Sequence, residues 1–101
     1  MGPMEPTLSE RDRWIVMVQG ELDVSTSHHL QELAGIFSGL GLGVDLDLGD
    51  VTFIDSSGWA GVLAAVEKLE EAGVPTRLVR PSDPVRRVAS VPDWAILTRA
   101  A

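Results

Sequence analysis

Strand-like and helix-like patterns of apolar residues alternate along most of this chain, and this alternation restricts its fold more than any other feature. Residues 14–22, WIVMVQGEL, are apolar at successive positions, which is typical of a central strand covered on both faces. Residues 44–48, VDLDL, alternate strictly, and residues 76–80, TRLVR, form another short strand-like run. PTLS at residues 6–9 predicts an edge strand that forms a hairpin with the first run. We therefore expect a mixed sheet that is mostly parallel after this hairpin.

Two longer segments each carry a single apolar stripe at helical spacing, which predicts helices that pack against the sheet. The stripe positions are Leu30, Leu33, Ala34 and Phe37 in the first segment and Trp59, Val62, Leu63, Val66 and Leu69 in the second. Ser25 or Thr26 can cap the first helix, and Pro84 marks the first turn of a short third helix. Residues 94–98, WAILT, fit either a final strand or the start of a last helix.

Size and charge limit the classes of function. The 101 residues correspond to one small domain, 1–101, in which we expect residues 1–6 to be a loose start. The chain has no cysteine, so neither a disulfide nor a thiolate metal site is available. Its net charge of -7 repels phosphate backbones and argues against nucleic-acid binding. No run approaches the roughly 18 apolar residues of a membrane span and no basic, apolar leader opens the chain, so we expect a soluble cytoplasmic protein without membrane insertion.

The residues FIDSSG, 53–58, lie where a strand-like run meets the second helical stripe. The first amides of a helix are unpaired and carry a partial positive charge, so Asp55, Ser56 or Ser57 can serve as the N-cap. The same position suits a serine that accepts a phosphate, because a phosphate gains from the helix dipole and the free amides. It would add about -1.5 to -2 charge beside Asp55. Residue type alone favours the cap and leaves the phosphoacceptor open.

Other chemistries fit these residues poorly. A hydrolase elbow needs a G-x-S-x-G pattern, which is missing around Ser56, and the adjacent His28 and His29 at a helix start are more typical of exposed residues than of a general base. SGLGLG, residues 38–43, precedes a strand and lacks the lysine of a nucleotide-binding loop. We therefore expect no catalytic residues and no cofactor.

Four aspartates could gather around a hard cation, but the sequence lacks a twelve-residue calcium loop. They are Asp45, Asp47, Asp50 and Asp55. We favour instead a strand face, carrying Asp45 and Asp47, that is at least partly wet or near a site, and we expect no metal site.

Two stretches together, GELDVSTSHHL at 20–30 and VTFIDSSGWAGVLAA at 51–65, resemble the STAS domain of bacterial anti-sigma factor antagonists. VDLDLGDV, residues 44–51, precedes the serine loop as in that family, and VRPSDPVRRVASVPDW, residues 79–94, is similar to its late strand and short helix. The resemblance extends over about residues 7–98. It implies an α/β fold, with a mixed four- to five-stranded sheet and helices packed mainly on one face.

The resemblance also implies a function. The unphosphorylated family member binds an anti-sigma factor that is also a serine-protein kinase, and the sigma factor is freed. The kinase then uses ATP to phosphorylate the first serine of the signature, here Ser56, and the complex separates. A phosphatase, expected to be of the PP2C type, resets the switch. The chain would be a substrate in this cycle and not an enzyme.

By the same match, Ser57 and Gly58 complete the acceptor loop, and Asp23 lies near it and helps the kinase engage. Asp23 is equally suited to cap the first helix, Ser57 fits a cap, and Asp55 fits a role in orienting the loop. Trp59 stands where the family usually has leucine, and it is either a core residue, the favoured alternative, or an exposed partner contact.

The family also offers an alternative function. STAS domains serve as subunits of membrane transport systems, where such a chain would act as an assembly or regulatory module without phosphorylation. A second departure from the pattern is Asp45, where valine or isoleucine is commoner.

Overall fold

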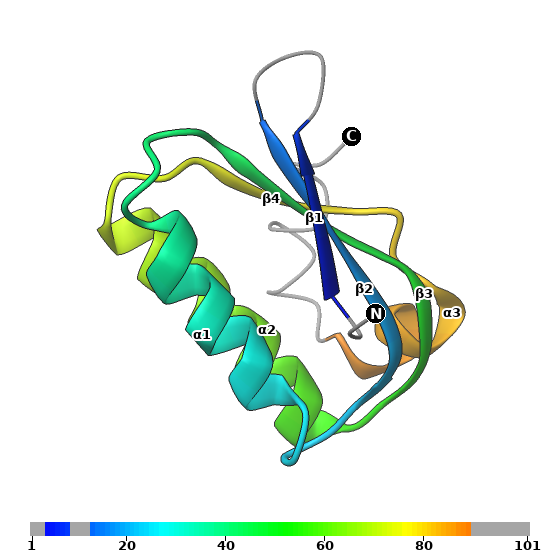
Figure 1. The fold of residues 1–101 in the computed structure, drawn as a ribbon. Helices are drawn as coiled ribbons and strands as arrows, with labels where there is room; N and C mark the ends of the chain where they lie inside the picture. Colours follow the sequence, from blue (N-terminus) through cyan, green and yellow to red (C-terminus); the bar gives the residue numbers. More distant parts are fainter. Residues whose placement is uncertain (1–3, 9–12, 90–101) are drawn as a thin grey trace.

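The computed structural model describes residues 4–8 and 13–89 of the chain. Its elements are β1 (Met4–Leu8), β2 (Trp14–Leu22), α1 (Ser27–Phe37), β3 (Val44–Ile54), α2 (Ser56–Glu71), β4 (Thr76–Val79) and α3 (Asp83–Val88), as drawn in Figure 1. This order confirms the predicted alternation of strands and helices. The prediction for residues 94–98 lies outside the described residues.

The four strands of the described residues form one mixed sheet in the order β1-β2-β3-β4. β1 runs antiparallel to β2, whereas β2, β3 and β4 are mutually parallel neighbours. Helices α1 and α2 lie side by side against one face of the sheet, and α3 lies beside β3 (Figure 1). The α/β fold with helices mainly on one face is therefore confirmed. The expectation of a loose start over residues 1–6 is wrong for residues 4–6, because the backbone of β2 pairs with them as part of β1.

The hydrophobic core fills the space between the sheet and the two long helices. Val16, Leu46 and Leu78 stand next to one another in register on β2, β3 and β4, and all three are buried. The predicted stripes supply the opposite side of this core. Their buried members are Leu30, Ala34 and Phe37 of α1 and Trp59, Val62, Val66 and Leu69 of α2. Each large apolar side chain that is removed from water here contributes about 1.5–3 kcal/mol.

The opposite face of the sheet carries an ion-pair cluster. Asp45 is only 8% exposed, so the expectation of a partly wet face is wrong for this residue. Arg77 donates to both carboxylate oxygens of Asp45, at 2.9 and 2.7 Å, and Nε of Arg13 donates to Oδ1 at 2.9 Å. These two guanidinium groups explain how an acid is accommodated where an apolar residue was expected. Asp47, two residues on, is half-buried and pairs with Arg80 at 3.2 Å.

The stability of the fold depends on pH through the charge of Asp45. Burial favours the neutral acid, but the hydrogen bonds from Arg77 and Arg13 outweigh it and hold the pKa of the Asp45 carboxyl below its usual range. In the unfolded chain the pKa of an aspartate is about 3.9. Because the pKa is lower in the folded chain, ionised Asp45 stabilises the fold above about pH 4. This contribution is lost as the pH falls through the pKa of the folded state.

We predict that Asp45→Asn lowers the free energy of unfolding at neutral pH by about 2 kcal/mol, because hydrogen bonds between two charged partners are lost. The deficit should begin to shrink below about pH 4, the pKa of an aspartate in the unfolded chain, and should vanish only after the pH has fallen through the lower pKa of folded Asp45. Urea denaturation of both proteins over a series of pH values measures it. Asp50→Asn is the matched control, since exposed Asp50 lies 3.8 Å from Arg80 and such surface pairs contribute at most about 1 kcal/mol. Equal losses in the two variants would contradict the prediction.

Candidate functional site

Two aspartates meet at one edge of the sheet because β2 and β3 are parallel and end together. Leu22, the last residue of β2, pairs with Ile54, the last residue of β3. The next residues are Asp23 and Asp55, which lead into α1 and α2. The amide of Asp55 donates to the carbonyl oxygen of Leu22 at 3.3 Å and ties the two junctions together. In α/β folds the crevices beyond the carboxyl ends of strands are the usual place for a functional site.

Asp55 caps helix α2. Its backbone is extended, with φ -109° and ψ -177°, and its Oδ1 accepts a hydrogen bond from the amide of Gly58 at 2.8 Å. Its carbonyl oxygen accepts from the amide of Trp59 at 2.9 Å, which is the first turn of the helix. The sequence left the cap open among Asp55, Ser56 and Ser57, and the geometry assigns it to Asp55.

Ser56 and Ser57 occupy the first two positions of α2, and both are exposed. Neither serine is needed as the N-cap, because Asp55 already fills that position. The expectation that Ser57 serves as a cap is therefore wrong. The structure thus presents two hydroxyls at the positive end of a helix of 16 residues, free of the capping role.

Gly58 and Trp59 anchor the start of α2 in the core. A Cβ atom on Gly58 would lie 2.2 Å from the carbonyl oxygen of Leu22, so only glycine lets the helix approach the end of β2 this closely. Trp59 is 5% exposed and belongs to the core cluster. The favoured core alternative for Trp59 therefore agrees with the structure, and the alternative of an exposed partner contact does not.

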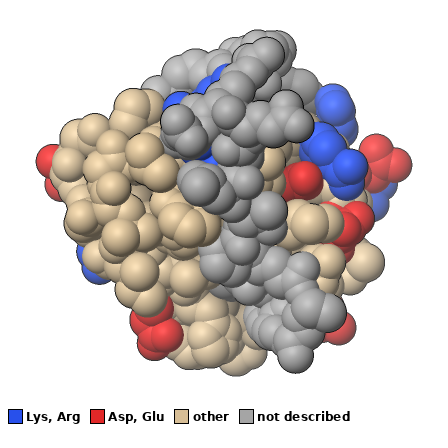
Figure 2. All heavy atoms as spheres, turned by 45° about the horizontal axis from the view of Figure 1, so that its top comes forward, with Lys and Arg blue, Asp and Glu red and all other residues tan. Residues whose placement is uncertain are grey.

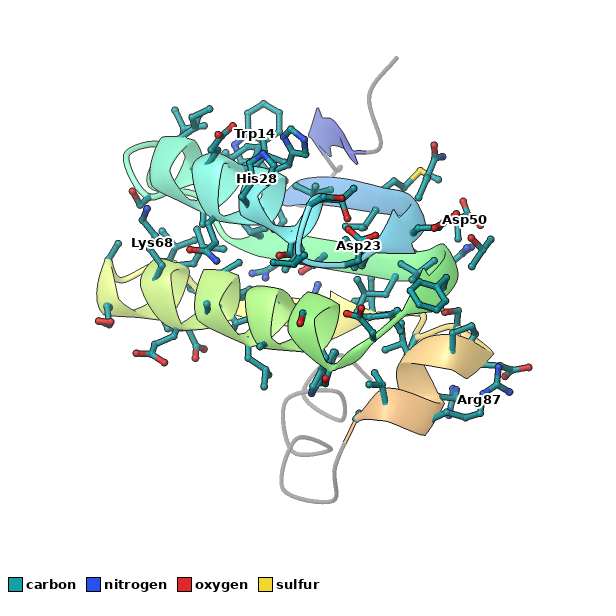
Figure 3. The ribbon with its side chains drawn as sticks, turned by 90° about the horizontal axis from the view of Figure 1, so that it is seen from below. Trp14, Asp23, His28, Asp50, Lys68 and Arg87 are labelled. Atoms are coloured by element: carbon teal, nitrogen blue, oxygen red, sulfur yellow. The ribbon has the colours of Figure 1, made fainter. Side chains whose placement is uncertain are left out.

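Asp23 closes its own loop before α1, which starts near it in Figure 3. Its Oδ1 accepts from the hydroxyl of Ser25 at 2.6 Å and from the amides of Ser25 and Thr26 at 2.9 and 3.2 Å. In return, Oγ1 of Thr26 accepts from the amide of Asp23 at 3.0 Å, a reciprocal pair that resembles a capping box. Thr26 is the N-cap residue by position but makes no side-chain capping bond, so this part of the prediction for Ser25 and Thr26 is wrong. The Ser25 hydroxyl is the main cause that lowers the pKa of the Asp23 carboxyl.

Two exposed apolar side chains flank these junctions, and the sequence patterns did not single them out. Val24, directly after Asp23, is 76% exposed, and Phe53, two residues before Asp55, is 47% exposed. Phe53 stands opposite exposed Glu21 on β2. The only sequence signal that could have identified Val24 and Phe53 is that each is an apolar residue close to Asp23 or Asp55. We call the surface formed by Val24 and Phe53, together with Asp23, Asp55, Ser56 and Ser57, the junction surface.

The arrangement presents two exposed serine hydroxyls next to acidic and apolar side chains. Within residues 4–8 and 13–89, no group of three or more His, Asp or Glu side chains is placed to hold a metal ion. In the same ranges, none of the helices combines the length and apolar character needed to cross a membrane.

We predict that Asp55→Ala lowers the free energy of unfolding by about 1 kcal/mol, because the amide of Gly58 loses its capping oxygen. Ser57→Ala is the control and should change it by less than about 0.5 kcal/mol, since this exposed serine does not cap the helix. Urea titrations followed by circular dichroism measure both. A loss in Ser57→Ala as large as that in Asp55→Ala would refute the assignment of the cap.

The close approach at Gly58 gives a second expected outcome. Gly58→Ala should destabilise the fold by about 1–3 kcal/mol, because the new methyl group overlaps backbone atoms of Leu22. Gly39→Ala is the control, because its Cβ would lie 3.8 Å from the carbonyl oxygen of Ile36, an ordinary contact. It should be neutral or stabilising by up to about 1 kcal/mol. Thermal melts compare the two, and unchanged stability in Gly58→Ala would contradict the packing argument.

Comparisons with known proteins cover most of the chain, including both junctions. A family model described as STAS domain matches residues 5–92. The solved structure of Mglu has a TM-score of 0.63 and 26% identity, over 79% of this chain and 19% of the Mglu chain, so the chain spans about a fifth of that protein. No curated protein sequence matches the chain.

Two structures of SpoIIAA match nearly end to end. The unphosphorylated form of this anti-sigma factor antagonist has a TM-score of 0.63 and 23% identity, over 92% of this chain and 94% of its own. The phosphorylated form of SpoIIAA, a Bacillus cell fate determinant, has a TM-score of 0.68 and 22% identity, over 95% and 86%. At these identities the likeness to SpoIIAA concerns the fold. Because the family match runs from residue 5 to residue 92, the chain belongs to the STAS domain family.

Proposed function

We propose that this STAS domain is an anti-sigma factor antagonist that binds an anti-sigma serine kinase while Ser56 is unmodified. The observation that carries the proposal is the exposed hydroxyl of Ser56 at the first position of α2, next to a cap that Asp55 supplies. A kinase can reach this oxygen, and the helix does not need it for capping. The structural likeness to SpoIIAA, which is known in phosphorylated and unphosphorylated forms, supports the same proposal.

Electrostatics explain how a phosphate on Ser56 would act. The phosphate would carry about -1.5 to -2 charge, and the amides and dipole at the start of α2 stabilise it, so the fold tolerates the modification. The carboxylates of Asp23 and Asp55 lie at the same edge, so negative charge would accumulate on the junction surface. A partner that covers this surface would then have to desolvate the phosphate, which costs free energy that the unmodified serine does not demand. Phosphorylation would therefore release the partner without unfolding the domain.

Asp23 would contribute by holding its loop. Its carboxylate bonds within residues 23–26, so it stabilises the conformation in which Val24 is presented to solvent. Ser57 and Gly58 would complete the surface that the kinase meets. The proposal gives the domain no catalysis, cofactor or metal of its own and places it in the cytoplasm. It also implies a PP2C-type phosphatase that removes the phosphate.

The test is phosphorylation by a purified anti-sigma kinase from the same genome, with ATP and intact-mass detection. The wild type and Ser57→Ala should each gain the mass of one phosphate, and Ser56→Ala should gain none. Ser56→Asp should bind the kinase more weakly than the wild type. Equal labelling of Ser56→Ala would refute the acceptor assignment. If such kinases neither bind nor label the wild type, the proposed function is wrong.

A further inference from the structure

A groove lies beside the junction surface, between the carboxyl-terminal end of β3 and α3. It measures about 360 Å³ and is lined by Thr52, Phe53, Ile54, Pro84, Arg87 and Val88. Ile54 directly precedes the cap Asp55, so the groove is continuous with the segment that carries the acceptor serine. Its volume is at the lower end of the range for ligand pockets, which suits a protruding side chain better than a larger molecule.

The groove is mainly apolar, and its aromatic wall is partly open to water. Phe53 is 47% exposed although it belongs to β3, and its cross-strand neighbour on β2 is the exposed acid Glu21. Pro84 and Val88 of α3 supply the opposite wall. An exposed aromatic residue in a cleft next to a functional segment is typical of residues that dominate binding energy at protein interfaces.

Arg87 gives the groove one cationic wall. Arg13, Arg77 and Arg80 each pair with an aspartate, whereas exposed Arg87 has no ion pair within the described part of the chain. Figure 3 shows Arg87 on α3 at the periphery of the molecule. In Figure 2, basic and acidic side chains lie next to one another along the right-hand edge. A cation next to apolar walls favours the binding of a partner segment in which an apolar side chain stands next to a carboxylate.

We infer that this groove is a docking site in which the kinase inserts an apolar side chain and pairs a neighbouring carboxylate with Arg87. The inference rests on the proposed function and adds to it a contact separate from the acceptor serine. The whole chain carries a net charge of -7, so general attraction would favour basic partners. A carboxylate at Arg87 would therefore fix the orientation of the kinase, as complementary charges do at interfaces. Docking here would hold Ser56 toward the kinase's nucleotide.

The matched pair Arg87→Glu and Arg86→Glu tests the docking site. Both arginines are exposed on α3, but Arg86 donates to the carbonyl oxygen of Pro81 at 3.2 Å and does not line the groove. The probe is the purified anti-sigma kinase, and calorimetry gives Kd while a phosphorylation assay gives KM and kcat. Arg87→Glu should raise Kd and KM about tenfold with little change in kcat, and Arg86→Glu should raise them less than about threefold. Phe53→Ala should weaken binding as Arg87→Glu does.

The outcomes separate this inference from the proposed function. If the wild type binds and is labelled on Ser56 while Arg87→Glu or Phe53→Ala behaves as the wild type, the docking site is wrong and the function stands. Equal weakening by Arg86→Glu and Arg87→Glu also overturns the site, because net charge alone would then explain the effect. If the wild type neither binds nor is labelled, both fail. Circular dichroism checks folding, and Arg87→Ala replaces Arg87→Glu if the latter unfolds.

Discussion

The parallel pairing of β2 with β3 is the constraint on which the rest of this structure depends. β2 has nine residues and β3 has 11, yet their first residues pair and their last residues pair, so β3 carries two more residues than its partner. The two extra residues of β3 are accommodated at two register shifts, and such irregularities bend and twist a strand. Because both strands nevertheless end at one edge, Asp23 and Asp55 lie side by side at the junctions that lead into α1 and α2. The exposed serines and the groove beside α3 both lie at that shared edge, because both adjoin the carboxyl end of β3.

The parts of the fold that depend on repeated patterns could be predicted from the sequence. The alternating run at residues 44–48 and the two helical stripes each contain several concordant positions, so one misleading residue does not change the result. The turn residues were harder, because Asp, Ser and Thr are all good N-caps and only backbone geometry distinguishes them. That is why the sequence left three candidates at the start of α2, whereas the structure assigns the cap to Asp55.

Features that depend on distant partners or on register were not predictable. Asp45 can be buried because Arg13, just before β2, and Arg77, on β4, reach it although each is 32 residues away along the chain. Phe53 faces solvent because the register shifts break the two-residue period of β3, so that Val51 and Ile54 are buried instead. The groove depends on α3 returning to that strand, and Arg87 gave no sequence signal of its own. The proposal that Ser56 is a phosphoacceptor came from the resemblance, since residue type alone favoured a cap.

The aspartate cap at residue 55 has an evolutionary consequence. Where a serine both starts a helix and receives a phosphate, selection for folding preserves the hydroxyl even after its signalling partner has disappeared. In this domain Asp55 supplies the cap, so the proposed acceptor, Ser56, is not needed for folding in that way. The serine at position 56 can therefore be lost or regained during evolution by a single substitution that changes the stability of the fold very little.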